Sequence, residues 1–110
     1  MIASIIDRDY TSVSILEEMS NIAEWLVTDP YLVIVDEELC SVGILVQRDV
    51  DKHPRRLVMD CDFAKPVVTP YHTLTEVLAL MKGTGLFYLP VIDDTAFMGV
   101  ISAVNVVKAM

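Results

Sequence analysis

The sequence predicts a mixed α/β (α+β) fold made of two pseudo-symmetric β-α-β-β-α repeats packed as one compact module. Residues 31–50 (YLVIVDEELCSVGILVQRDV) and 88–107 (YLPVIDDTAFMGVISAVNVV) follow the same order of features. Each has an apolar segment, an acidic turn, a second apolar segment with a glycine, and a helix start. Corresponding residues lie 57 positions apart before the turn and 56 after it, because the first turn is one residue longer. A repeat of this period predicts two supersecondary units packed on each other.

Length and composition agree with this architecture. A chain of 110 residues forms at most one compact domain, and each half would be marginally stable alone. Apolar residues make up 54% of the chain, above the roughly 45–50% of typical domains. This excess predicts sheets covered on both faces, or apolar surface kept for a partner subunit.

The first half of the chain predicts a helix, two strands and a second helix. Residues 12–26 form the first helix, capped by Thr11 or Ser12, because their apolar residues recur at a 4-3-4 spacing. The strands are 32–35 and 42–47, and the second helix begins at Arg48. This second helix is stopped by Pro54. The apolar face of the first helix contains Ile15, Met19, Ile22 and Leu26.

The second half repeats this order. Residues 66–69 predict a short strand, and Thr73 with Glu76 predicts a capping box at the start of the next helix. Residues 83–85 (Gly-Thr-Gly) end that helix. The strands 87–92 and 97–102 and a closing helix from Ala103 complete the copy. The repeats are therefore placed at 1–54 and 66–110, with a linker at 55–65.

The closing helix is apolar nearly all round, which predicts burial on several sides. One side can cover its own sheet, and another is expected to face a second copy in a homodimer. Its apolar residues are Val104, Val106, Val107 and Met110.

Net charge and sequence motifs narrow the class of function. A net charge of −8 argues against a nucleic-acid partner. Two interpretations of the basic cluster within 48–56 stay open: a solvated loop, or a site for a phosphate or an acidic partner. No Ser-His-Asp order, HExxH, GxxxxGK[ST] or GxSxG motif occurs, so a binding module is expected and not an enzyme. His53 and His72 are isolated, so no metal site is expected. The basic cluster contains Arg48, Lys52, His53, Arg55 and Arg56.

Cysteine usage and hydropathy suggest a location. Cys40 and Cys61 lack a CxxC spacing and are expected to be two reduced, buried thiols. The first ten residues do not resemble a signal peptide, and no apolar run approaches the roughly 20 residues of a membrane span. We therefore expect a cytoplasmic chain with no membrane partner, which can still be part of a larger protein.

These residues resemble a tandem pair of cystathionine-β-synthase (CBS) domains, also called a Bateman module. The second copy carries PVVTPYHTLTEVLALM followed by LPVIDDTAFMGVIS, and the first carries GILVQRD, which is similar to the family's G-[IV]-[VL]-T-x-R-D. Together the two copies cover nearly the whole chain. The resemblance implies a regulatory module that binds an adenosine compound, such as AMP, ADP, ATP or S-adenosylmethionine, in the cleft between repeats. It implies no required cofactor.

The resemblance also implies which residues contact the ligand. The family pattern places a Ser or Thr for phosphate three residues before an Asp for the ribose hydroxyls. In the first copy Asp49 is in place, Val46 stands where the hydroxyl is expected, and Arg48 can partly replace that contact. In the second copy Ser102 is present, and Asn105 stands where the acid is expected. In the second site Tyr88 and Pro90 would lie beside the base, with backbone groups from Val67 and Val68 at its edge.

Structural roles compete with each of these assignments. Asp49 can be an acid that favours a helix start through the dipole, and Ser102 can be a helix cap. Asn105 can be a polar helix residue, and Tyr88 can belong to the core. A ligand-free dimerisation or docking module with degenerate nucleotide sites is therefore the alternative function. In both cases the regulated partner protein is unknown.

Overall fold

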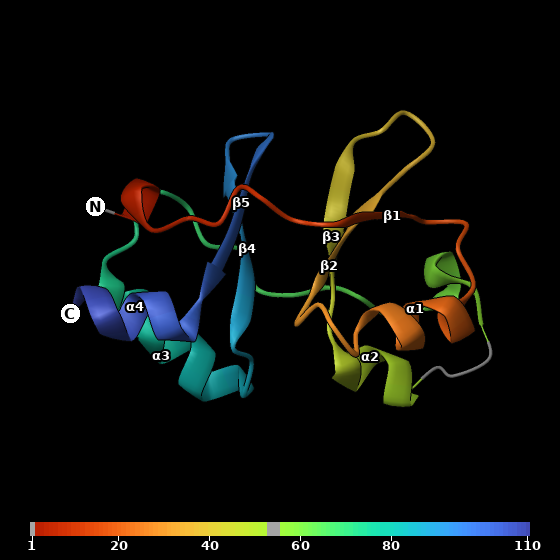
Figure 1. Cartoon of the computed structure of the whole chain (residues 1–110). Coiled ribbons are helices and arrows are strands. Elements are labelled where there is room, and N and C mark those ends of the chain that lie inside the picture. The colour runs from red at the N-terminus through yellow and green to blue at the C-terminus, as the bar shows by residue number, and fades with distance from the viewer. Residues whose placement is uncertain (1, 53–55) are drawn as a thin grey trace. The chain divides into compact units, whose positions relative to one another are not determined.

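The computed structural model describes residues 2–52 and 56–110 (Figure 1). The predicted helix stop at Pro54, and His53 and Arg55 of the basic cluster, lie outside the described residues. The described chain forms two compact units. The first-repeat unit is Tyr10–Ala64, and the second-repeat unit combines Met1–Asp9 with Lys65–Met110. The repeat boundaries 1–54 and 66–110 stay a prediction, because these compact units divide the chain at other positions.

The first-repeat unit is built on a three-stranded sheet. Its strands are β1 (Ser12–Ser14), β2 (Leu32–Val35) and β3 (Ser41–Leu45), in the order β1-β2-β3. β1 runs parallel to β2, and β2 runs antiparallel to β3. The helices are α1 (Met19–Trp25) and α2 (Gln47–Lys52), followed by the 3-10 turn η2 (Val58–Asp60). The core of this unit includes Met19, Ile22, Leu32, Ile34, Leu45, Val50 and Val58.

The predicted helix over 12–26 is wrong in its first half. Ser12–Ser14 is a strand whose central Val13 is buried between two exposed serines. Its backbone pairs in register with Val33–Val35, and this non-local pairing outweighs the local helical spacing. The helix begins only at Met19, after Glu18 as N-cap, so neither Thr11 nor Ser12 caps it. β1 thereby supplies the first strand of the β-α-β-β-α order.

The second-repeat unit contains a two-stranded antiparallel sheet. Its strands are β4 (Tyr88–Asp93) and β5 (Ala96–Ser102). The helices α3 (Leu74–Thr84) and α4 (Ala103–Ala109) pack on each other, and η1 (Ile2–Ser4) is a 3-10 turn. The strand predicted at 66–69 is reduced to one parallel bridge, in which the Val68 N–H donates to Pro90 O at 2.9 Å and Val68 O accepts from Ile92 N at 2.8 Å.

The two hairpins show the predicted pseudo-symmetry in their backbones. The β2–β3 register shifts between Ile34 and Val35, and the β4–β5 register shifts between Val91 and Ile92, 57 residues later. Ile34 and Val91 each lie opposite a glycine of the partner strand. A bulge at the same position of both copies confirms that the mixed α/β fold is built from two related units.

The predicted ends of α3 are both confirmed. The Thr73 hydroxyl accepts from Glu76 N at 3.1 Å, and Glu76 Oε1 accepts from Thr73 N at 2.9 Å, which completes a capping box. Gly85 follows the helix in the left-handed region, with φ of 71°, and donates its N–H to Met81 O. The capping box and the C-terminal glycine depend only on residues close in sequence. Both could therefore be predicted without knowledge of tertiary contacts.

The two cysteines differ in their exposure. Cys61 is buried as expected, but the prediction was wrong for Cys40, which is exposed in the turn between β2 and β3. That turn carries the acidic residues of the hairpin end, and Asp36 Oδ1 accepts there from Glu38 N and Cys40 N. Among residues 2–52 and 56–110, no helix combines the length and apolar character that a membrane crossing requires.

The capping box makes stability depend on pH through Glu76. The backbone N–H of Thr73, and then its side chain, lower the pKa of Glu76 below the ordinary 4.5. A lowered pKa means that the stabilisation is complete above pH 4.5 and is lost as the pH falls through the lowered pKa. We expect Glu76→Gln to lower the melting temperature at pH 7 and the difference from wild type to shrink at pH 3. Glu37→Gln, in an exposed turn, is the control. An equal difference at both pH values would show that ionisation is not the cause.

Candidate functional site

The first candidate pair lies at the start of α2. Val46 is the residue before the helix, and Asp49 is its third residue. Asp49 Oδ2 accepts a hydrogen bond from Val46 N at 2.9 Å, and Asp49 N donates to Val46 O at 3.0 Å. Asp49 is only 4% exposed. The helix start therefore holds the carboxylate in one orientation, with a small part of the residue at the surface.

The second candidate pair occupies the same position at the start of α4. Ser102 is the N-cap, and its hydroxyl accepts from Asn105 N at 3.2 Å. The Asn105 side chain bonds elsewhere: its Nδ2 donates to Ile5 O at 3.4 Å, in the N-terminal segment. The structure thus gives Ser102 the predicted capping role and gives Asn105 a partner 100 residues away.

The two helix starts contain opposite halves of one capping box. At α2 the side chain of the third residue reaches the N-cap backbone, and at α4 the N-cap side chain reaches the backbone of the third residue. The spacing that suits a nucleotide therefore also satisfies backbone N–H groups. These bonds do not use the full hydrogen-bonding capacity of the Asp49 carboxylate or the Ser102 hydroxyl. A carboxylate has about four acceptor positions, and a hydroxyl that accepts one bond can still donate another.

The remaining candidates of the second repeat lie close to Ser102. Tyr88 is half-buried at the start of β4 and pairs directly with Ser102 across the hairpin. Pro90 is buried and lies opposite Val100. Since β4 already binds the N–H of Val68, only the second lone pair of its carbonyl could reach a base while the bridge is intact. Its neighbour Val67 is 45% exposed and is the better placed of the two.

In the first-repeat unit, Arg48 follows directly after Gln47 and is exposed beside the buried Asp49. Arg56 and Lys52 of the predicted basic cluster are also exposed. The structure therefore gathers Val46, Arg48 and Asp49 at one helix start, and Ser102, Asn105 and Tyr88 at another.

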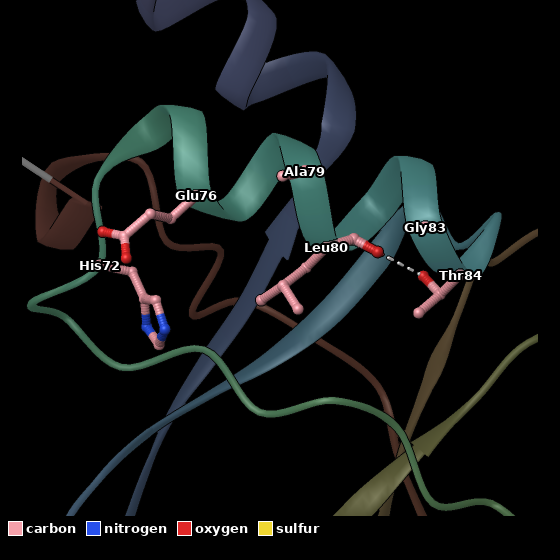
Figure 2. Close-up of a pocket in the computed structure, with 6 residues that line it drawn as sticks. All are labelled: His72, Glu76, Ala79, Leu80, Gly83 and Thr84. Carbon is pink, nitrogen blue, oxygen red and sulfur yellow. Dashed lines mark hydrogen bonds between the residues drawn. The ribbon is translucent and has the colours of Figure 1, made fainter.

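A pocket that the sequence analysis missed lies along α3 in the second-repeat unit (Figure 2). Its volume is about 580 Å³, and its polar end carries His72 and Glu76. His72 Nδ1 accepts from Thr69 N at 2.9 Å, which fixes the turn before the helix. The available signal was a four-residue spacing, which places 76, 80 and 84 along one side of α3, with His72 in the turn just before the N-cap. The pocket is lined by His72, Glu76, Ala79, Leu80, Gly83 and Thr84.

Comparisons with known proteins agree with this architecture. Residues 57–110 match the family model of the CBS domain, which corresponds to the second repeat. A search of the curated proteins found no match.

Solved structures match the chain over nearly its whole length. An uncharacterised conserved protein from Pyrococcus horikoshii has a TM-score of 0.81 and 14% identity, covering 98% of this chain and 89% of that one. The CBS domain pair of protein MJ0100, in complex with 5′-methylthioadenosine and S-adenosyl-L-methionine, has a TM-score of 0.80 and 17% identity, covering 99% and 94%. CBSX2 in complex with AMP has a TM-score of 0.79 and 21% identity, covering 98% and 93%.

At these identities the structural likeness establishes the fold, and the family model identifies the domain. Residues 57–110 are the matched domain, and the preceding repeat has the same hairpin and helix order. Residues 57–110 therefore match the CBS domain, and the chain as a whole has the fold of the solved CBS pair of MJ0100.

Proposed function

We propose that this chain is a regulatory module that binds an adenosine-containing ligand and signals by a change of conformation. Similar structures were solved with AMP, and with 5′-methylthioadenosine and S-adenosyl-L-methionine. The observation that carries the proposal is the oriented carboxylate of Asp49 at the start of α2. Its role is recognition and not catalysis, and the ligand is a signal and not a required cofactor.

The chemistry of the ribose explains why Asp49 is the key residue. A carboxylate can accept two hydrogen bonds from a cis-diol, and an oriented carboxylate loses little entropy on binding. The exposed Arg48 supplies a positive charge for a phosphate, in place of the hydroxyl that Val46 lacks. In the second repeat, the Ser102 hydroxyl lies opposite Tyr88, whose ring offers a surface for a base. The first repeat therefore carries the stronger ribose contact, and the second the stronger base contact.

Signalling requires a difference in affinity between two conformations. A ligand that bound both conformations equally would shift nothing, however tightly it bound. The ligand is therefore expected to prefer one conformation of the module, which a partner protein then recognises.

A thermal-shift screen tests the proposal. The purified chain is heated with AMP, ADP, ATP, NAD or S-adenosylmethionine, each at millimolar concentration. Binding to the folded state adds RT ln(1 + [L]/Kd), about 2.7 kcal/mol at a hundredfold excess over Kd. We expect a clear rise in melting temperature with at least one adenosine compound and a smaller rise with ribose 5-phosphate, which lacks the base. No rise with any of them would reject an adenosine ligand.

A second candidate function is a docking module whose nucleotide sites have degenerated. The observation in its favour is that Asn105 is bonded to Ile5 and Ser102 caps α4, so both side chains already have structural roles. This candidate predicts that the chain binds a protein partner with unchanged affinity in the presence and absence of adenosine compounds. The thermal-shift screen therefore separates the two functions.

We also propose that the module forms a homodimer through its helices. Two apolar side chains of α4 and that of its C-cap remain about 60% exposed: Val104 at 59%, Val107 at 60% and Met110 at 59%. An apolar face of this kind on a short helix is typical of an interface between subunits.

Val107→Glu is expected to convert a dimer into a monomer, because two carboxylates would be brought into an apolar contact. Val27→Glu makes the same change at a residue that is 83% exposed in the first-repeat unit, and it should leave the dimer intact. Light scattering at micromolar concentration measures both masses. A wild-type monomer, or equal effects of the two variants, would contradict this interface.

A further inference from the structure

The N-terminal segment packs on the second repeat, far from its own place in the sequence. In Figure 1 it runs in red past β5. Asp7 and Val100 exchange both backbone hydrogen bonds, at 2.8 and 3.0 Å, so the segment continues the pairing of β5. Arg8 Nη1 donates to Met98 O at 3.1 Å, and Ile2 is completely buried. We call residues 2–8 the strap.

Asn105 bonds to the strap through its side-chain NH2 group. The aspartate that the CBS pattern has at this position lacks such a donor. Asn105 Nδ2 donates to Ile5 O, and a carbonyl oxygen needs a donor. An aspartate at the same position would set a carboxylate against that carbonyl, with repulsion in place of a hydrogen bond. The strap therefore gives a physical reason for an asparagine at a position where a ribose-binding acid is expected.

Asn105 would have to serve two partners at once. The amide of Asn105 is the group that the second site would use for a ribose hydroxyl, and Ile5 O occupies one of its two N–H donors and holds the side chain toward the strap. A ribose that lies away from the strap would have to rotate the amide, which breaks the bond to Ile5 O. The strap would then be held mainly by the Asp7–Val100 bridge and the burial of Ile2.

We propose that Asn105 is a positioning residue that fastens the strap, and that the strap and a ribose-bearing ligand compete for its side chain. The competition rests on the proposed nucleotide function, whereas the fastening does not. A ligand in the second site would loosen the strap, and the strap would reduce the affinity of that site. The N-terminal segment then reports on occupancy of the second repeat.

Hydrogen exchange of the whole chain without ligand tests the fastening. Asn105→Asp should exchange the amides of Asp7 and Val100 about tenfold faster than wild type, because one hydrogen bond is lost and a repulsion added. Asn105→Gln keeps an amide donor and should exchange near the wild-type rate. Asn21→Asp is the matched control, because Asn21 Nδ2 donates to Glu17 Oε1 at 2.8 Å in the other unit. Equal exchange of these two amides in Asn105→Asp and Asn21→Asp would overturn the fastening.

A second arm with AMP tests the competition. At AMP concentrations that saturate the thermal shift, the Asp7 amide of the wild-type chain should exchange several-fold faster, even though the chain as a whole is stabilised. Asn105→Asp should show no further acceleration and should bind AMP more tightly. Saturating AMP that leaves or slows Asp7 exchange would overturn the competition. An absence of any thermal shift would reject the proposed nucleotide function and the competition together, and the ligand-free arm would still decide the fastening.

Discussion

Gly99→Ala is expected to destabilise the chain by about 2–4 kcal/mol and to release the strap. Gly99 has a φ of 141°, which residues with a side chain rarely adopt. A Cβ at this position would collide with Asp7 O and would lie 2.6 Å from Ile6 Cγ2. The backbone oxygen has little room to move, because Asp7 O accepts from Val100 N. The added methyl group and the strap therefore cannot occupy the same place.

Gly83→Ala is the matched control, with an effect of opposite sign. Gly83 lies within α3, and a Cβ there would meet nothing within 4 Å. Alanine in a helix is favoured over glycine, so stability should rise by about 0.5–1 kcal/mol. Urea unfolding of both variants gives the two values, and hydrogen exchange at Val100 shows whether the strap is lost. A cost below about 0.5 kcal/mol for Gly99→Ala would show that the strap does not pack on β5 as described.

Asp49→Ala is expected to weaken AMP binding by about 100-fold. A hydrogen bond to a charged group contributes about 1.5–3 kcal/mol, and this substitution removes the acceptor of the ribose hydroxyls. It also removes the bond from Val46 N, so the chain should lose about 1 kcal/mol of stability through the start of α2. The free energy of AMP binding should fall by more than the free energy of unfolding, because the lost cap stabilises only one short helix.

Asp51→Ala separates these two effects. Asp51 lies on the same helix, is exposed, and accepts from Gln47 Nε2 at 3.2 Å, so the change in charge is the same. It should leave AMP affinity within about twofold of wild type, since it does not touch the candidate site. Titration calorimetry at a temperature where both variants are folded measures the affinities. Equal affinities of the two variants would remove Asp49 from the ligand site.

Local sequence signals predicted the elements that depend on neighbouring residues. The capping box of Thr73 and Glu76, and the glycine that ends α3, act within one helical turn. The hairpins were predicted from apolar runs with a turn between them, and the repeat in the sequence reappears as a bulge at equivalent positions. These features need no distant partner, which explains why they could be predicted.

Apart from the exposure of Cys40, the errors concern pairings between distant parts of the chain. Ser12–Ser14 followed a helical apolar spacing, but its strand is set by β2, about 20 residues away. The Asp7–Val100 bridge and the Asn105–Ile5 bond join positions more than 90 residues apart, and no local pattern announces them. Asn105 departs from the family pattern already in the sequence, but the carbonyl that it binds is found only in the structure.

The ligand-binding residues stay a prediction, and the structure shows the other roles that two of them have. Ser102 and Asp49 stand at the predicted helix starts, and each also satisfies a backbone group there. A spacing of three residues at a helix start suits both a cap and a nucleotide, so the pattern alone could not separate the two.

The most direct test of the account is an NMR titration of the isotopically labelled chain with AMP. Nucleotide binding at the proposed residues predicts saturable shifts of the Val46 and Asp49 amides, with smaller shifts at Ser102 and Asn105. In Asp49→Ala the shift of the Val46 amide should need about 100-fold more AMP to reach its midpoint. Spectra that do not change at millimolar AMP, or a Val46 shift with the same midpoint in Asp49→Ala, would contradict a nucleotide-binding function at this site.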